Sequence, residues 1–357
     1  MNYQARREAI LEKMEKGSIG VLYAGIPTHV SADEYAHFQA NRNFFYLTGL
    51  RREKMALVLD KAVEPAKVTL FIEEADPSRE RWYGRKVTVE EAREISGIRD
   101  VQLITALDGA VASKMTREDV QQVYFDTYRH SQEDLPDYNA VKACEFRELY
   151  PGVPVKNLFP LVAGERMWKD SDEVALIRKA VGLTKEALKN VMKSLAPGRK
   201  EYEAQAEFEY SIFKGGAEGP AFPTIAGSGM NGTMLHYDTN RDTCRDGSLL
   251  LLDLGARVSG YNSDITRKRQ VYDLVLAANR RVAAEAGPGK TLKELNDICK
   301  EVLARGLMEL GLIQQEDQVS RYYMHSVSHH LGIDVHDVNV AANEKLRPGA
   351  VITDEPG

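Results

Sequence analysis

The sequence contains little cysteine, no long apolar run and no strong excess of positive charge. Its three cysteines, Cys144, Cys244 and Cys299, lie far apart and form no C-x-x-C pair, so we expect reduced thiols in a cytoplasmic protein. The densest apolar run, 249–252, ends at Asp253, well short of the roughly 18–20 residues that a membrane span requires. The 47 basic and 53 acidic residues give a formal charge of −6, which argues against nucleic-acid binding and against a polybasic membrane anchor.

The composition is typical of an ordinary globular protein. A hydrophobic fraction of 43% with 28% charged residues excludes disorder as a description of the whole chain. The first sixteen residues are rich in charge and lack the apolar core of a secretory leader, so we expect none. At roughly 100–200 residues per domain, 357 residues suggest about two domains.

The first half of the chain is expected to form a layered α/β domain. An amphipathic helix is predicted near the N-terminus, ending at Gly17. Further segments alternate in type, with strands predicted at 19–23, 44–47, 55–59 and 67–72 and helices at 89–95 and 135–143.

The second half has an α+β pattern. Helices are predicted at 173–193, 201–214, 271–285 and 292–309, and strands at 249–257, 261–267, around 327–335 and at 350–354. Ser171 is expected to cap the first of these helices. The polar stretch 168–173 marks the boundary, so we predict domains at 1–170 and 171–357.

Two aspartates lie on the predicted hairpin 249–267. Ser259-Gly260 forms a plausible two-residue turn, and this register places Asp253 opposite Thr266. Asp264 then lies two residues along on the same face, at a diagonal distance of at most about 7–8 Å. Most such pairs are solvated turn residues, but Asp253 follows four leucines, and a buried charge needs a partner.

Four of the eight histidines, His325, His329, His330 and His336, fall within twelve residues. Each alone is most simply a polar loop or core residue, but imidazole is a common ligand of divalent transition metals. A carboxylate at Glu355 follows the last predicted strand. Two aspartates, a histidine and a glutamate form an oxygen-rich ligand set that favours Mn²⁺ or Zn²⁺ over Ca²⁺.

The sequence resembles the dinuclear-metal "pita-bread" peptidases, which include methionine aminopeptidase, prolidase and aminopeptidase P. The second half carries the resemblance in Asp253…Asp264-Ile-Thr-Arg, His325-x-x-x-His329-x-x-Gly332-x-x-x-His336-Asp337, Glu355-Pro356-Gly357 and Gly227-Ser-Gly229-x-Asn231-x-x-x-Leu235-His236-Tyr237. The first half resembles the creatinase-like N-terminal domain of aminopeptidase P in Phe38-Gln-Ala-Asn-Arg-Asn43-Phe-Phe-Tyr46-Leu-Thr-Gly49 and Arg81-Trp82-Tyr-Gly84-Arg85. The implied fold is α+β: a C-terminal pita-bread domain with a curved antiparallel sheet, preceded by an α/β creatinase-like domain.

The resemblance also implies roles for single residues. Asp253 would bind one metal ion, Asp264 would bridge two, and His329 and Glu355 would bind the other. The two ions are expected to be Mn²⁺, with Co²⁺ or Zn²⁺ as alternatives. His236 and His336 would hydrogen-bond the scissile carbonyl or the tetrahedral intermediate, and His325 would flank the proline of the substrate. Glu355 would also relay a proton from the attacking water to the leaving nitrogen.

The sequence departs from the family pattern in two places. A fifth ligand, a second bridging glutamate, is expected beyond Glu-Pro-Gly, but the sequence ends at Gly357. The segment between Arg267 and the next helix is also about a dozen residues shorter than the motif context implies. We expect both gaps to reflect omitted segments, with domain 171–357 incomplete at its C-terminus; a protein truly truncated here would be expected to fold poorly and lack activity.

The leading hypothesis is a metallo-aminopeptidase that releases the N-terminal residue from peptides with proline in second place. A prolidase, which cleaves only Xaa-Pro dipeptides, would share the same metal site. A non-catalytic binding module on the same fold is the third hypothesis, disfavoured because every ligand position within the sequence is filled. The family resemblance also implies a homodimer or homotetramer, and neither nucleic acid nor membrane is expected as a partner.

Overall fold

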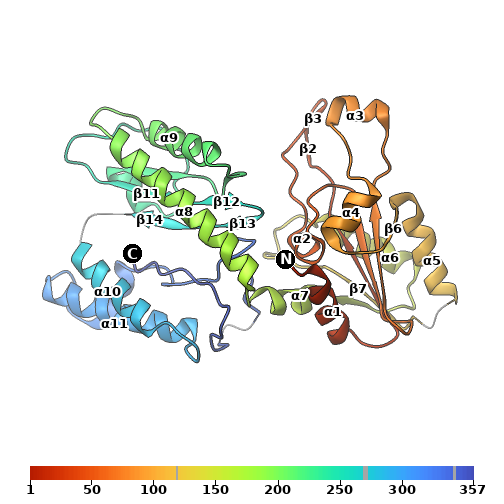
Figure 1. Cartoon of the computed structure of the whole chain (residues 1–357). Coiled ribbons are helices and arrows are strands. Elements are labelled where there is room, and N and C mark those ends of the chain that lie inside the picture. The colour runs from red at the N-terminus through yellow and green to blue at the C-terminus, as the bar shows by residue number, and fades with distance from the viewer. Residues whose placement is uncertain (118–119, 268–271, 341–342) are drawn as a thin grey trace. The chain divides into compact units, whose positions relative to one another are not determined.

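The computed structural model of the 357-residue chain describes every residue except 118–119, 268–271 and 341–342 (Figure 1). The chain divides into two compact units, Met1–Glu165 and Arg166–Gly357. Within the described part of the chain, no helix is both long enough and apolar enough to cross a membrane.

The first unit is built on a mixed six-stranded sheet with the order β6-β5-β4-β1-β7-β8. Its strands are β1 (Ser18–Tyr23), β4 (Ala56–Asp60), β5 (Lys67–Ile72), β6 (Asp100–Leu103), β7 (Gln122–Phe125) and β8 (Val155–Asn157). The helices are α1 (Tyr3–Lys13), α2 (Arg42–Thr48), α3 (Pro77–Tyr83), α4 (Val89–Ser96), α5 (Leu107–Arg117), α6 (Tyr138–Leu149) and α7 (Phe159–Arg166), with a short hairpin of β2 (His29–Ser31) and β3 (Glu34–Tyr35) (Figure 1). Residues of β1, β4 and β7 pack with α5 and α6 to form one apolar core.

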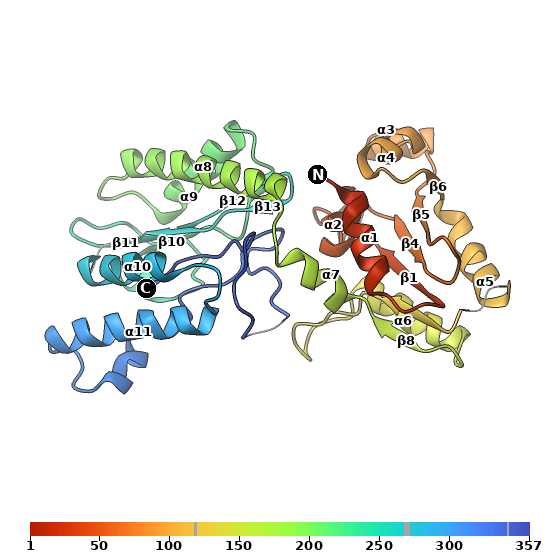
Figure 2. The same cartoon turned by 60° about the horizontal axis from the view of Figure 1, so that its bottom comes forward.

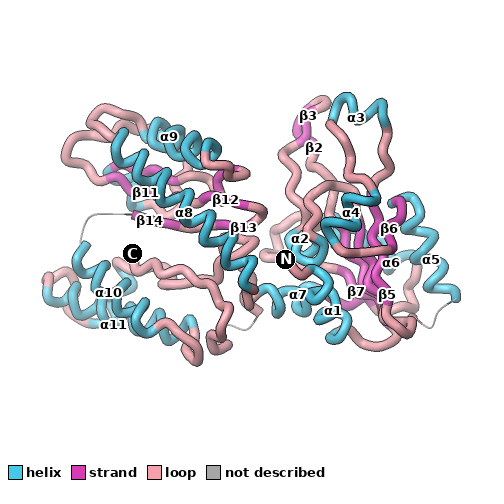
Figure 3. Tube along the Cα trace, in the orientation of Figure 1, coloured by secondary structure: helices cyan, strands magenta, loops and turns pink. Residues whose placement is uncertain are grey.

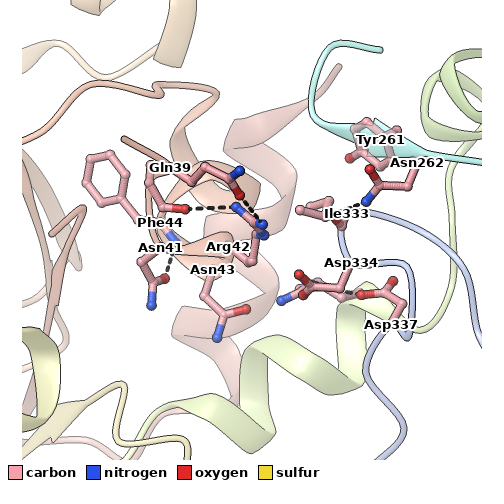
Figure 4. Close-up of polar contacts among 12 residues, drawn as sticks. Gln39, Asn41, Arg42, Asn43, Phe44, Tyr261, Asn262, Ile333, Asp334 and Asp337 are labelled. Atoms are coloured by element: carbon pink, nitrogen blue, oxygen red, sulfur yellow. Dashed lines mark hydrogen bonds and ion pairs between the residues drawn. The ribbon is translucent and has the colours of Figure 1, made fainter. Parts of the chain in front are cut away.

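The strand predicted at 44–47 is wrong, because these residues lie in helix α2 (Figure 3). The Asn41 side chain caps this helix by accepting a hydrogen bond from Phe44 N at 2.9 Å (Figure 4), and Gly49 ends it in the left-handed conformation. All four residues are buried, and a short apolar run that is buried on every side has no periodicity that separates helix from strand.

The second unit places helices on both sides of small antiparallel sheets (Figure 2). Helices α8 (Ser171–Ser194) and α9 (Glu201–Lys214) pack with residues of the sheets β10-β11-β14 and β13-β12-β9. The strands are β9 (Gly219–Pro220), β10 (Ile225–Ser228), β11 (Leu250–Leu254), β12 (Ala256–Val258), β13 (Tyr261–Asn262) and β14 (Ile265–Arg267). Helices α10 (Tyr272–Glu285) and α11 (Leu292–Glu309) form a second core with the 3-10 helix η3 (Glu316–Arg321) and residues near the end of the chain.

Helix α8 is capped by Asp170 and not by Ser171, which is its first residue. The Asp170 side chain accepts a hydrogen bond from Glu173 N, and the Glu173 side chain accepts one from Asp170 N. This reciprocal pair satisfies two backbone donors at the helix start, which a serine one residue later could not do with the same spacing.

The hairpin turn predicted at Ser259-Gly260 is confirmed. Val258 pairs with Tyr261, and the two turn residues have φ angles of 49° and 83°, as a two-residue type I′ turn requires. The strand predicted at 249–257 is divided into β11 and β12 at Gly255. A Cβ atom at Gly255 would lie 2.1 Å from Ser263 O, so this backbone crossing requires glycine.

We expect Gly255→Ala to lower the free energy of unfolding by about 2–3 kcal/mol or more, because the added methyl group must displace backbone atoms. Gly182→Ala, on the exposed surface of α8 with no atom within 4 Å, is the matched control and should be neutral or stabilising. Urea unfolding of the two variants tests this difference. Equal midpoints would show that the crossing at Gly255 can relax.

Candidate metal centre

The predicted pairing of Asp253 with Thr266 is confirmed. Strand β11 pairs antiparallel with β14, and Asp253 stands directly opposite Thr266. Thr266 Oγ1 donates a hydrogen bond to Asp253 Oδ1 at 2.9 Å. Ser263 N donates to Ala256 O, which continues the same register past the strand ends. Asp264 therefore lies diagonally across from Asp253 on the same face.

A second antiparallel pairing brings His329 and Glu355 together. His330 bridges Ile352, Thr353 N donates to His329 O at 3.0 Å, and Glu355 N donates to the carbonyl of residue 327 at 2.8 Å. His329 is therefore opposite Thr353, and Glu355 lies two residues further along the same face. The sequence predicts strands around 327–335 and at 350–354. The structure has only this short ladder there, with no strand of several residues among the described positions.

The side chains of Asp264, His329 and Glu355 converge on one point. His329 Nε2 lies 3.2 Å from Glu355 Oε1 and 3.7 Å from Asp264 Oδ2, and the three potential ligand atoms all lie within 4.8 Å of one another. His329 Nδ1 donates to His330 O at 3.0 Å, because a carbonyl can only accept. In the neutral form of His329 this bond keeps the proton on Nδ1 and leaves the Nε2 lone pair facing the carboxylates.

Two buried atoms of this cluster fit a bound cation. His329 Nε2 and Glu355 Oε1 have no hydrogen-bond partner among the described residues. A neutral Nε2 and a carboxylate oxygen are both acceptors, so neither can satisfy the other, whereas a divalent cation would satisfy both. A proton competes for the same atom: burial lowers the pKa of His329, but Glu355 and Asp264 outweigh this effect and raise it.

The carboxylates of the cluster also require positive charge between them. Burial, together with the charges of Asp253 and Glu355, raises the pKa of Asp264 to about 8. Burial likewise raises the pKa of Asp253, although the hydrogen bond from Thr266 opposes this change. The raised pKa of Asp264 and its closeness to Asp253 favour a proton or a cation between the two carboxylates. A divalent ion would remove the repulsion that holds this proton in place.

His236 and His336 lie beside the carboxylate cluster. The His336 ring centroid is 4.1 Å from that of His329, with an angle of 34° between the planes. Burial and the neighbouring His329 lower the pKa of His336, which favours its neutral form. His236 interacts electrostatically with both groups: it opposes the rise in the pKa of Asp253 and contributes to the lowered pKa of His336.

His325 and His330 occupy different surroundings. The His325 ring is 4.9 Å from the Tyr323 ring, its Nδ1 lies 2.9 Å from Ser326 O, and its charge contributes to a lower pKa of Glu355. His330 is the residue after His329 on an extended segment, so its side chain leaves the opposite face. Burial lowers the pKa of His330 to about 4, as expected of a neutral core histidine.

A buried charge cluster that no sequence pattern predicted includes Asp337, the residue after His336 in the chain. Arg166 donates to Asp334 Oδ2 and Asp337 Oδ1 at 2.7 and 2.5 Å, and Lys169 Nζ lies 2.8 Å from Asp337 Oδ2. Asp337 directly follows His336, so the cluster holds the backbone that carries this histidine. The basic residues precede α8, and no local pattern in the sequence links them to residue 337.

The family assignment follows from comparison with known proteins. The profile of metallopeptidase family M24 matches residues 175–357, and that of the aminopeptidase P N-terminal domain matches residues 3–124. The chain belongs to metallopeptidase family M24. This M24 chain is 30% identical to the Xaa-Pro aminopeptidase of Escherichia coli K12, over 99% of the chain and 86% of that protein.

Solved structures confirm the pita-bread fold and the creatinase-like N-terminal domain of this M24 chain. A Bacillus anthracis structure assigned as an aminopeptidase P matches with a TM-score of 0.96 and 36% identity, over 99% of this chain and 87% of that one. The low-pH form of E. coli aminopeptidase P matches with a TM-score of 0.87 and 29% identity, over 98% and 85% of the two chains. The shortened segment expected after Arg267 begins at residues 268–271, which lie outside the described residues.

We expect Asp337→Asn to destabilise the protein by about 3–5 kcal/mol at pH 7, because it leaves the buried Lys169 without its counter-ion and takes one carboxylate from Arg166. Burial raises the pKa of Asp337, but Arg166 and Lys169 outweigh it, and the net pKa is lowered. Because the folded-state pKa is lowered, ionised Asp337 stabilises the fold at pH values above the usual titration range of aspartate. This stabilisation is lost as the pH falls through the folded-state pKa.

The difference between wild type and Asp337→Asn in urea unfolding should therefore be largest near pH 7 and shrink below about pH 4. Asp297→Asn, which breaks an exposed pair with Lys293, is the matched control and should cost less than about 1 kcal/mol at either pH. An undiminished difference at pH 3 would contradict the charge-pairing explanation.

Proposed function

We propose that this chain is a metal-dependent aminopeptidase that hydrolyses the bond between an N-terminal residue and a penultimate proline. Its family makes it a metallopeptidase, and the relatives that match nearly the whole chain include Xaa-Pro aminopeptidases. The observation that carries the proposal is the convergence of Asp264, His329 and Glu355, with two buried acceptor atoms left unsatisfied.

We propose two Mn²⁺ ions at this site, with Co²⁺ or Zn²⁺ as alternatives. Asp253 would bind one ion, Asp264 both, and His329 with Glu355 the other. The single imidazole among three carboxylates supports Mn²⁺, which accepts oxygen-rich ligand sets. When bound, such ions lower the pKa of a water molecule and polarise a carbonyl group.

The remaining roles belong to the protein's own side chains. Glu355 would accept a proton from the attacking water and deliver it to the leaving imino nitrogen. His236 and His336 would hydrogen-bond the carbonyl oxygen as negative charge develops on it. The lowered pKa of His336 favours its neutral form, which donates from a single ring nitrogen. His325 would lie against the proline of the substrate.

The same proposal covers the domain boundaries, the oligomeric state, the cellular location and the binding partners. Domain 1–170 would be the creatinase-like domain and 171–357 the catalytic domain, in a homodimer or homotetramer. The cytoplasmic location is supported by three cysteines that are all free thiols. Peptide substrates would be the binding partners, with neither nucleic acid nor membrane involved.

Asp264→Asn should abolish metal binding and hydrolysis together, because it removes the carboxylate proposed to bridge both ions. After dialysis against Mn²⁺, elemental analysis should show bound metal in the wild type and less than about a tenth of it in the variant. Asp246→Asn, in an exposed loop, is the control and should keep both properties. Near-normal turnover of Asp264→Asn would refute the bridging role.

Arg-Pro-Pro should be hydrolysed to free arginine by the Mn²⁺-loaded protein, because an aminopeptidase leaves room beyond the proline. Arg-Ala-Pro tests the need for proline in second place and should be a much poorer substrate. Cleavage of the dipeptide Ala-Pro alone would establish a prolidase. A folded protein that contains no metal and cleaves none of the three peptides would establish a binding module. Mass spectrometry of the products distinguishes these cases.

A further inference from the structure

A buried carboxylate outside the metal cluster accepts four hydrogen bonds. Glu201, the first residue of α9, is 0% exposed. Its Oε1 accepts from Ser228 N at 2.7 Å and from Asn231 Nδ2 at 3.0 Å. Its Oε2 accepts from Tyr237 Oη at 2.8 Å and from Asp242 N at 2.8 Å. Both oxygens are therefore fully used by groups from a single segment, 228–242.

The Glu201 carboxylate is held as an anion by neutral donors. In the described part of the chain, no lysine, arginine or histidine forms an ion pair with it. Burial raises the pKa of Glu201, but the hydrogen bonds from Asn231, Ser228, Asp242 and Tyr237 outweigh burial and lower it. Removing one acceptor oxygen from such a site leaves a buried donor unpaired, which costs more than the lost bond itself.

The four donors bracket His236 in the sequence. Ser228 and Asn231 precede it, and Tyr237 and Asp242 follow it. Apart from Ser228 at the end of β10 and the 3-10 helix η2 (Gly229–Thr233), the segment has no regular structure. Tyr237 is the residue next to His236, and its hydroxyl group also accepts from Asn231 Nδ2 at 3.0 Å. Glu201 thus joins the two ends of the segment to a rigid helix.

The same segment begins at the end of a strand that pairs with β11. Ser228, the last residue of β10, is directly opposite Leu250, three residues before Asp253 on β11. The backbone of Glu201 reinforces the far end, because its N–H donates to Asp242 O at 3.0 Å. A fixed start at Ser228, opposite Leu250, and a fixed end at Asp242 restrict where the residues between them can lie.

We propose that Glu201 is a positioning residue, which holds the segment 228–242 in the one conformation that places His236 at the active site. This role rests on the proposed contact of His236 with the scissile carbonyl. Glu201 itself does not touch the substrate. Its function is to reduce the freedom of the residues between β10 and Asp242, whose only regular structure is the short helix η2.

Hydrogen exchange of Glu201→Gln tests the structural half of this proposal without any need for activity. The carboxamide nitrogen of glutamine would face either Ser228 N–H or Asp242 N–H, and two donors cannot pair. We expect exchange within 228–242 to rise at least about 10-fold while α8 and α11 keep their protection. Glu186→Gln, the same change on the exposed face of α8, should leave all rates unchanged. Unaltered exchange in 228–242 would overturn the proposal.

A double-mutant cycle tests whether Glu201 acts through His236. We expect Glu201→Gln to lower kcat on Arg-Pro-Pro by roughly 10-fold or more with little change in KM and in bound Mn²⁺. In the His236→Ala background, the same change should alter kcat by less than about 2-fold, because the group that it positions is gone. Full additivity would overturn the positioning role and assign Glu201 to general stability.

The two proposals fail in distinguishable ways. A wild-type protein that cleaves no Xaa-Pro peptide would refute the proposed function, and the exchange result would then show whether Glu201 orders the segment. An active wild type with additive kcat effects would refute the positioning role and leave the peptidase assignment intact.

Discussion

The structure of this site depends on mutual repulsion among three carboxylates. Asp253, Asp264 and Glu355 lie on partly buried surfaces, close enough that the pKa of Asp264 rises to about 8. Water cannot screen these charges as it does at an exposed surface, so either a proton or a cation must separate them. The lone pair of His329 Nε2, aimed at the same point, favours a cation because it also needs an electrophilic partner.

Two antiparallel pairings place these groups with the same geometry. In each, a threonine stands opposite one ligand candidate, and a carboxylate lies on the diagonal two residues away: Thr266 with Asp253 and Asp264, Thr353 with His329 and Glu355. The backbone register therefore sets the spacing of the ligand atoms before any ion binds. This dependence on register explains why the crossing between β12 and β11 uses glycine, which permits the close approach to Ser263.

The part of the site that could be predicted from sequence is the part fixed by local chemistry. The hairpin 253–266 has a short turn that determines its register, so the position of Thr266 followed from the sequence alone. The pairing of His329 with the segment around Glu355 closes a loop with no comparable signal, and only family resemblance suggested it. The strand predicted at 44–47 failed because complete burial removes the amphipathic pattern that distinguishes helix from strand. The role of Glu201 could not be predicted from the sequence, because the four groups that donate to it follow no periodic spacing.

Two carboxylates outside the metal cluster hold the segments that carry His236 and His336, and they do so by opposite means. Asp337 is neutralised by two buried cations, whereas Glu201 is stabilised by four neutral donors. Neither arrangement uses the candidate metal ligands themselves. The histidine-bearing segments therefore have sources of order that persist when the cation is absent, and cation binding need not build the surrounding site. A preformed arrangement of this kind lowers the conformational-entropy cost of substrate binding, because the residues around the substrate are already ordered. This is the physical basis of a preorganised active site.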